Sequence, residues 1–335
     1  MSDLLTLQHI SKQFEKKQDL AIKIAKRLGA KIQSQTVHAV DDVSLSIAPG
    51  EVVGLVGESG CGKSTLGRVA AGIHPPSSGQ LLWKSQPISP ASEALLKIQM
   101  VFQDPMSSLN PRHRIDRIIS EAPLFHKQIK PKDASDFVAN LLEKVGLDPD
   151  FRVRYPHQFS GGQRQRIAIA RALAVNPDIV VADEAVSALD VSVQAQVLNL
   201  FMDLRQELGL AYLFISHDLG VVEHIADRVF IMYLGRVVES ASTESIFAQP
   251  MHPYAQALLA EVPRLKTGKR RFQPISGEIP SPINPPSGCH FHPRCPLADE
   301  TCRTQQPVLR TISPGHSVAC HNVANSQPQI KEYSR

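Results

Sequence analysis

A glycine-rich run that follows a short apolar segment constrains this chain more than any other feature. The apolar segment is Val52–Val56, and the run after it reads Gly57-Glu58-Ser59-Gly60-Cys61-Gly62-Lys63-Ser64-Thr65. This is the G-x-x-x-x-G-K-[ST] spacing of a P-loop, whose backbone N–H groups turn inward on the phosphates of a nucleotide. We expect Lys63 to reach the β- and γ-phosphates, Ser64 to coordinate Mg²⁺ and Thr65 to add a phosphate contact.

A second apolar segment, Ile179–Ala182, ends in two carboxylates. If this segment is a buried strand, Asp183 lies near the Mg²⁺, and Glu184 lies where it can polarise an attacking water. An alternative is that the pair only caps the helix that follows. The combination with the P-loop favours the catalytic interpretation.

The hydrophobic pattern predicts an α/β fold. Short apolar runs that end in a polar residue or a glycine are typical of buried strands in a mostly parallel sheet. Helical patterns such as 193–208, which stops at Gly209, alternate with them. Apolar and polar residues alternate at Leu4–Leu7 and Asp42–Ile47, which indicates half-buried strands. Residues 229–240 indicate a hairpin through Gly235. The predicted buried strands are Val52–Val56, Met100–Phe102, Ile179–Ala182 and Tyr212–Ile215.

Charge and length exclude several classes of protein. The chain has 335 residues, with 36 Lys and Arg against 32 Asp and Glu, and a net charge of +4 is too small to predict nucleic-acid binding. No apolar run reaches the roughly 18 residues that span a bilayer, and the first residues lack a signal-peptide pattern, so a cytoplasmic protein is expected. Residues 16–35 predict a short basic amphipathic helix, which either packs on its own domain or contacts lipid or a membrane partner.

The segment Phe159–Gln163 opens a predicted helix over 164–173. Ser160 can cap this helix, and the two glycines expose its N–H groups, which makes an anion site with no phosphate of its own. Here the sequence resembles the ATP-binding cassette (ABC) family, whose signature motif is commonly Leu-Ser-Gly-Gly-Gln. The resemblance implies a dimer in which the signature segment of one subunit binds the γ-phosphate of an ATP molecule held by the opposite subunit. The binding residues would be Ser160, Gly161, Gly162 and Gln163.

Further motifs in the expected order extend this resemblance. Gln103, in Gln103-Asp104-Pro105, matches the Q-loop glutamine, which senses Mg²⁺ and the attacking water and faces the membrane partner. His217 matches the switch histidine that contacts the γ-phosphate, and Ser187–Asp190 matches the D-loop, through which two ATPase subunits communicate. The resemblance therefore implies catalytic roles for Glu184, His217, Lys63 and Gln103, and Mg²⁺ ligation by Ser64, Gln103 and Asp183.

The implied fold is an ABC-type P-loop nucleotide-binding domain with a mostly parallel core sheet, an antiparallel β part and a helical signature subdomain. Each nucleotide motif occurs once, so the chain is expected to be a single ATPase unit. Phe14 is the candidate for the family's aromatic residue that stacks on adenine, and core packing is its alternative role. Ala185 stands where the family usually has proline, which removes a restraint on φ but no functional group.

Four of the five cysteines lie near the end of the chain, in a proline-rich segment. Four thiolates can hold a [4Fe–4S] cluster, and these wide gaps do not match the close pairs of structural zinc sites. The alternatives are zinc, with His290 or His292 as a further ligand, and unligated thiols. The cysteines are Cys289, Cys295, Cys302 and Cys320.

This segment also resembles the C-terminal region of oligopeptide and dipeptide transporter ATPases. The matching stretches are 252–259, 281–286 and 288–296, and we divide the chain into an ATPase domain, 1–265, and a C-terminal extension, 266–335. The resemblance implies a bacterial importer that takes up di- or oligopeptides. Its implied partners are a second ATPase subunit in a heterodimer, two transmembrane permease subunits and an extracytoplasmic peptide-binding protein, at the cytoplasmic face of the inner membrane.

Two alternatives remain at this point. The same motor can serve nickel, glutathione or antimicrobial peptides, because the ATPase does not touch the cargo. A soluble ABC-type ATPase that acts on DNA or ribosomes is the other alternative. It is disfavoured because the sequence has neither a long coiled coil between its motifs nor a tandem cassette.

Overall fold

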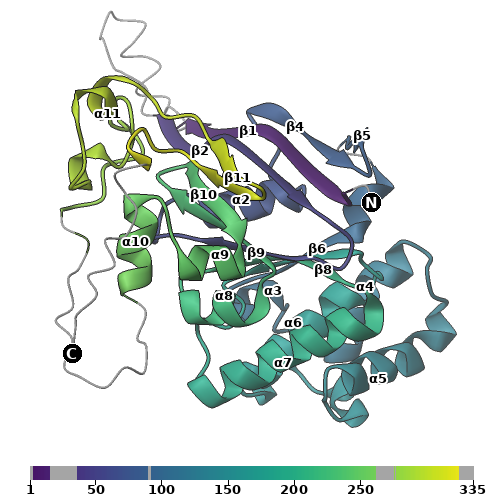
Figure 1. The fold of residues 1–335 in the computed structure, drawn as a ribbon. Coiled ribbons are helices and arrows are strands. Elements are labelled where there is room, and N and C mark those ends of the chain that lie inside the picture. The colour runs from purple at the N-terminus through teal and green to yellow at the C-terminus, as the bar shows by residue number, and fades with distance from the viewer. Residues whose placement is uncertain (1–2, 16–35, 90–91, 262–274, 276, 324–335) are drawn as a thin grey trace, which may run out of the picture.

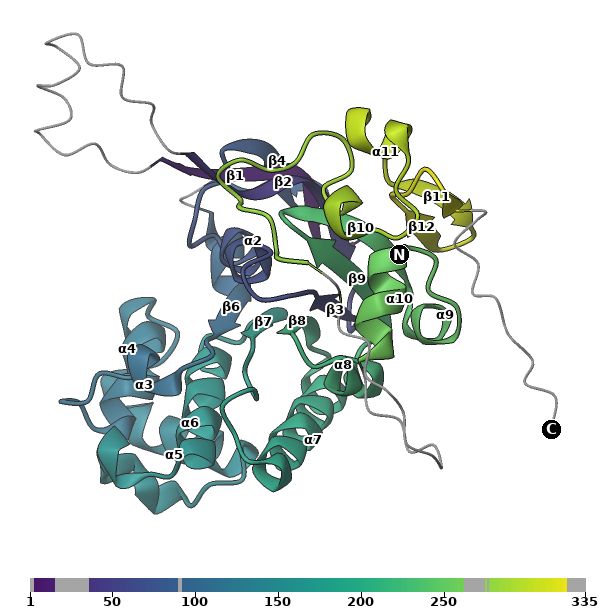
Figure 2. The same cartoon turned by 90° about the vertical axis from the view of Figure 1, so that its left-hand side faces the viewer.

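The computed structural model describes residues 3–15, 36–89, 92–261, 275 and 277–323. Within these ranges the chain forms two β-sheets surrounded by helices, and the predicted α/β fold is confirmed (Figure 1 and Figure 2). The predicted basic helix in 16–35 and the predicted boundary at residue 265 lie outside the described residues. None of the described helices is long and apolar enough to cross a membrane.

The larger sheet has eight strands among the described residues, in the order β11-β12-β10-β9-β3-β8-β7-β6. The strands from β9 to β6 run parallel. The residues of the central strand, β3, point to two different apolar clusters. Val52 and Val56 pack on one face of the sheet, and Val53 and Leu55 pack on the other. The predicted buried strands are confirmed as β3 (Val52–Val56), β6 (Ile98–Val101), β7 (Ile179–Asp183) and β8 (Ala211–Ser216).

The smaller sheet is antiparallel and has the order β2-β1-β4-β5. It contains both strands that the alternating pattern predicted, and Leu5 pairs with Ile47 in register. Figure 1 shows this sheet lying above the parallel strands, with α2 near both sheets. Its strands are β1 (Leu5–Glu15), β2 (Thr36–Ile47), β4 (Ser78–Trp83) and β5 (Gln86–Pro87).

The helices gather mainly on one side of the parallel strands, where α3 to α7 form the helical subdomain (Figure 2). The predicted stop at Gly209 is confirmed, because this residue ends α7 in the left-handed conformation at φ 67°. The helices are α2 (Lys63–Ala70), α3 (Pro105–Ser108), α4 (Ile115–Phe125), α5 (Ala134–Lys144), α6 (Gly161–Leu173), α7 (Val191–Leu208), α8 (Leu219–Ile225), α9 (Thr243–Ala248), α10 (Pro253–Ala260) and α11 (Glu300–Thr304).

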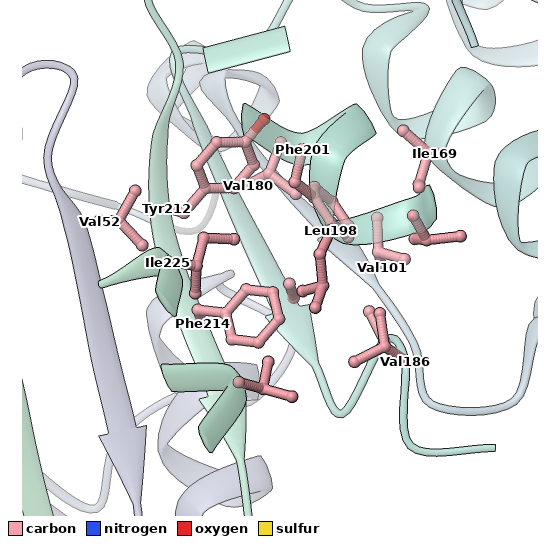
Figure 3. Packing of buried hydrophobic residues seen from close by; sticks show 14 of the residues in the cluster. Val52, Val101, Ile169, Val180, Val186, Leu198, Phe201, Tyr212, Phe214 and Ile225 are labelled. Atoms are coloured by element: carbon pink, nitrogen blue, oxygen red, sulfur yellow. The ribbon is translucent and has the colours of Figure 1, made fainter. Parts of the chain in front are cut away.

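Aromatic packing fixes α7 against the parallel strands. Phe201 of α7 meets the rings of Tyr212 and Phe214 edge to face, with centroid separations of 5.5 and 6.0 Å (Figure 3). Both partners belong to β8, and Val180 of the neighbouring β7 lies in the same cluster. The two strands that end at the candidate site are therefore held by a well-packed core.

The C-terminal extension continues the larger sheet. The predicted hairpin is confirmed as β9 (Arg228–Tyr233) and β10 (Arg236–Ser242), and the extension adds a second hairpin, β11 (Arg310–Ser313) and β12 (His316–Val318), to the free edge of β10. The sequence analysis did not predict this second hairpin. As expected from its prolines, the described part of the extension has no long helix.

A buried carboxylate joins β10, β12 and the start of α10. Glu239 is fully buried, and its carboxylate accepts hydrogen bonds from the backbone N–H of Met251 at 2.8 Å and of His252 at 2.7 Å. His316 of β12 lies 2.7 Å from the same carboxylate through its Nε2. Burial raises the pKa of Glu239, whereas its hydrogen bonds act in the opposite direction.

We predict that Glu239→Gln lowers the free energy of unfolding by about 1–3 kcal/mol. An amide has only one acceptor oxygen, so at least one of the two backbone donors loses its partner inside the protein. Urea denaturation of the full chain measures this difference. Glu300→Gln is the matched control, because the side chain of Glu300 is 79% exposed, and an equal loss in both variants would contradict the prediction.

Candidate ATP-hydrolysing site

The P-loop leaves the end of β3 and enters α2, as the sequence predicted. Its glycines are required by the neighbouring backbone. A Cβ on Gly57 would lie 2.1 Å from the carbonyl oxygen of Met232, and a Cβ on Gly62 would lie 2.0 Å from that of Ala39. Gly62 also has φ 105°, which side chains other than hydrogen rarely allow. Only glycine at these two positions lets the loop pass so close to β9 and β2.

The side chain of Lys63 points back into the P-loop. Its ammonium donates hydrogen bonds to the carbonyl oxygens of Gly57 at 2.7 Å and Glu58 at 2.9 Å, and the residue is buried. Cys61 is also buried, and burial raises the pKa of its thiol. The charge of Lys63 is therefore concentrated at the centre of the loop, where phosphates bind in P-loop proteins.

Oxygen ligands suited to Mg²⁺ meet beside the P-loop. Ser64 donates its hydroxyl hydrogen bond to the carboxylate of Asp183, with 2.7 Å between Oγ and Oδ1. Burial raises the pKa of Asp183, and the hydrogen bond from Ser64 opposes this effect. A divalent cation favours the ionised carboxylate, so a hydroxyl and a carboxylate at this separation fit a Mg²⁺ ion.

Glu184 lies at the centre of the remaining polar groups. Gln103 donates a hydrogen bond from Nε2 to its carboxylate at 3.0 Å, and Nδ1 of His217 is 3.3 Å from the same oxygen. The backbone of Glu184 has φ 48°, an uncommon conformation for a residue with a side chain. The alternative role as a helix cap is wrong, because α7 begins only after Asp190, which occupies its N-cap position.

One pocket collects the P-loop and the catalytic candidates. Gln103, Glu184 and the aromatic candidate Phe14 line it, whereas His217 does not. The P-loop residues that line it are Ser59, Gly60, Gly62, Lys63, Ser64 and Thr65. The ring of Phe14 is 38% exposed and meets His74 edge to face at 5.6 Å, so the alternative role in core packing is wrong. Stacking on adenine stays a prediction.

The signature segment lies on the surface of the same chain and begins α6. Ser160 and Gln163 form a reciprocal cap, in which each side chain accepts the backbone N–H of the other residue at 3.3 and 3.0 Å. A Cβ on Gly162 would lie 2.4 Å from Val193 of α7, so glycine allows close packing there. Ser160, Gly161 and Asp190 are exposed, and among the described residues none of the signature segment lines the P-loop pocket.

The four cysteines of the extension line one small cavity, which His252, Phe291 and His292 also line. Nevertheless, among the described residues no three His, Cys, Asp or Glu side chains lie in positions that could hold a metal ion. Burial raises the pKa of the thiols of Cys295 and Cys320 to about 11. The structure therefore brings the four thiols to a common cavity without forming a metal centre.

The sequence analysis missed a contact between the extension and the P-loop. Arg294 lies far along the chain from Glu58, yet their side chains form two hydrogen bonds of 2.7 and 2.9 Å. The hydroxyl of Tyr254 in α10 accepts the backbone N–H of Glu58 at 2.9 Å. No local pattern signals a contact across 236 positions, because it depends on how the extension packs on the ATPase core.

Comparison with known families agrees with this arrangement. Residues 40–187 match the family described as ABC transporter, and residues 238–302 match the family described as the C-terminal region of oligopeptide/dipeptide transporters. Two solved structures are 26% identical to this chain. They are cbiO1 of Clostridium perfringens, with a TM-score of 0.61 over 74% of this chain and 92% of that one, and MJ0796 bound to ADP and phosphate, with 0.60 over 71% and 98%.

Curated relatives are similar over most of their length. The dipeptide transport ATP-binding protein DppF of Haemophilus influenzae is 54% identical over 86% of this chain and 90% of its own length. The oligopeptide transport ATP-binding protein AppF of Bacillus subtilis is 53% identical over 85% and 89%, and DppF of Escherichia coli 52% over 86% and 87%. The chain therefore belongs to the ATP-binding subunits of the oligopeptide/dipeptide ABC transporter family.

Proposed function

We propose that this chain hydrolyses ATP to energise the import of di- or oligopeptides across the bacterial inner membrane. The observation that carries the proposal is the match of residues 238–302 to a C-terminal region of peptide transporters, joined to a P-loop pocket lined by Lys63, Ser64, Gln103 and Glu184. The relatives named for dipeptide or oligopeptide transport support the same cargo class. Nickel, glutathione and antimicrobial peptides are the competing cargoes.

The chemistry follows from the groups around Glu184. Its carboxylate acts as the base that polarises the attacking water, and Gln103 and His217, both hydrogen-bonded or close to it, orient that water and the γ-phosphate. Lys63 leaves its two carbonyl partners to pair with the β- and γ-phosphates. Ser64, Asp183 and Gln103 would hold Mg²⁺, which would supply positive charge to neutralise the phosphates.

The active unit is a head-to-tail dimer in which the P-loop of one chain and the signature segment of the other enclose ATP. Two observations support this: Ser160 and Gly161 of the signature segment are exposed, and the segment lies outside the pocket of its own P-loop in the described structure. MJ0796, of similar fold, is described as dimeric after hydrolysis. The second subunit is a related ATPase, and Asp190 lies at the shared interface.

Closure of this dimer is transmitted to two membrane-spanning permease subunits through the surface around 103–114. Gln103 links this surface to the site, because the same side chain that bonds Glu184 begins the segment leading into α3. The chain thus sits at the cytoplasmic face of the membrane, and an extracytoplasmic binding protein delivers the peptide to the permeases.

The four cysteines of the extension hold a [4Fe–4S] cluster. Their convergence on one cavity supports this, and the backbone N–H groups of Phe291, Leu297 and Asn322 oppose the rise in pKa that burial causes at the thiols of Cys289, Cys295 and Cys320, respectively. Such donors stabilise thiolates in iron–sulfur sites. Because no three of these side chains are placed to hold a metal ion in the described structure, binding of the cluster requires the cysteine side chains to move. The cluster would stabilise an extension with little core of its own.

We predict that Glu184→Gln retains ATP binding and loses turnover by about a hundredfold or more, because the amide cannot accept a proton from water. Binding of a fluorescent ATP analogue and release of phosphate measure the two effects. Glu223→Gln, on the exposed face of α8, is the control. Near-normal hydrolysis by Glu184→Gln would remove Glu184 as the base.

In cells, uptake of a labelled dipeptide by wild type and Glu184→Gln tests the cargo, with nickel uptake measured in parallel. We expect the variant to lose dipeptide uptake alone. Loss of nickel uptake with unchanged dipeptide uptake would reassign the cargo. Unchanged uptake of both would contradict the import proposal.

For the P-loop we predict that Gly62→Ala weakens binding of the ATP analogue by about tenfold or more, because the added Cβ overlaps a backbone oxygen at a positive φ. Gly60→Ala is the matched comparison, since its Cβ would meet open space and only the backbone strain remains. Equal losses in both variants would show that the contact with Ala39 does not matter.

Anaerobically purified protein is predicted to be brown and to contain about four iron atoms per chain. Cys295→Ser should lose the colour and most of the iron, whereas Cys61→Ser, at the cysteine outside the extension, should keep both. A colourless protein that contains zinc, or no metal at all, would rule out the iron–sulfur proposal.

A further inference from the structure

The extension contacts the phosphate-binding loop through one buried arginine. Arg294 has a side chain that is only 3% exposed, and its guanidinium bonds both oxygens of the Glu58 carboxylate, from Nη1 to Oε2 at 2.7 Å and from Nη2 to Oε1 at 2.9 Å. Two parallel bonds of this kind fix the direction of the carboxylate as well as its distance. Arg294 also donates to the hydroxyl of Tyr233 at 3.4 Å.

Glu58 is the second residue of the P-loop, and the protein holds it by three of its groups. The carboxylate bonds Arg294, the backbone N–H donates to the hydroxyl of Tyr254, and the carbonyl oxygen accepts from Lys63. Arg294 and Tyr254 therefore bond the same residue whose carbonyl oxygen Lys63 must release to pair with phosphate. The first half of the loop depends on the C-terminal part of the chain for its position.

The arginine is itself held rigidly. It ends a short 3₁₀ helix, His292–Arg294, and its backbone N–H donates to the carbonyl of Phe291 at 3.0 Å. Phe291 is buried, and its ring lies 5.2 Å from that of Tyr233 and 5.3 Å from that of Tyr254. This aromatic cluster joins the extension to β9 and α10, and it touches the salt bridge through Tyr233, whose hydroxyl accepts from Arg294.

We propose that Arg294 is a positioning residue for ATP: through Glu58 it holds the first half of the P-loop in the conformation that receives the phosphates. The inference rests on the proposed role of the P-loop in binding ATP. Loss of the guanidinium leaves the Glu58 carboxylate without its charged partner beside the loop, so the backbone N–H groups that should face the phosphates lose their fixed direction.

The test compares Arg294→Ala, Arg294→Lys and Glu58→Gln in the full chain. We expect Arg294→Ala to raise the KM for ATP by about tenfold, with a smaller change in kcat. Arg294→Lys and Glu58→Gln should raise the KM less. Lysine keeps a positive charge but lacks the two parallel N–H donors of a guanidinium, and glutamine lacks the negative charge of the carboxylate. Arg303→Ala is the matched control, since this arginine of the same extension is 57% exposed and pairs with Glu300 on the surface.

A double variant separates positioning from general destabilisation. If Arg294 acts through Glu58, the combined Arg294→Ala and Glu58→Gln variant is no worse than Arg294→Ala alone, because the second change has nothing left to disrupt. Additive losses would overturn the proposal. If Arg294→Ala does not fold, Glu58→Gln still reports the interaction, because it leaves the extension intact.

Hydrogen exchange provides a readout that does not require ATP hydrolysis. Backbone amides in 57–65 should exchange faster in Arg294→Ala than in wild type or Arg303→Ala, whereas amides of α7 should not change. Unchanged exchange in the loop together with an ATP affinity within about twofold of wild type would overturn the proposal. A wild-type chain that neither binds nor hydrolyses ATP would instead contradict the proposed function.

Discussion

The structure depends on how closely the backbone of the P-loop approaches its neighbours. Two carbonyl oxygens, of Met232 in β9 and Ala39 in β2, occupy the space that side chains at Gly57 and Gly62 would need. One belongs to the parallel sheet and the other to the antiparallel sheet, so both must be in place for the loop to take its shape. The hydrogen bonds from the N–H of Gly235 to Cys61 and from that of Asp41 to Gly235 join the same three segments.

The larger sheet also sets the positions of the reactive groups. β7 and β8 run parallel and adjacent, so their carboxyl ends meet at one edge, where Asp183 ends β7, Glu184 follows it and His217 follows β8. The core around Phe201 holds these strands in register. Two carboxylates, a serine hydroxyl and a lysine therefore come together because of strand order and a single glycine-rich turn.

Much of this was predictable from sequence because the signals are local. Buried strands appear as apolar runs, Gly209 ends a helix, and a P-loop has a fixed spacing, so the central strands and α7 were predicted correctly in type and nearly in extent, and the P-loop joins β3 to α2 as expected. The roles of the pocket residues stay predictions. What was missed depends on distant parts of the chain. Neither the pairing of β12 with β10 nor the contact of Arg294 with Glu58 leaves a periodic pattern, because each is decided by tertiary packing.

The salt bridge between Arg294 and Glu58 also has a consequence for synthesis of the protein. Translation produces the P-loop early, and the strands that surround it are complete by Tyr233, yet Glu58 has no arginine partner until the chain has grown past residue 294. In a nascent chain shorter than this, the P-loop is therefore present while Glu58 still lacks its ion pair. A chain that stops before residue 294 lacks the side chain that pairs with Glu58.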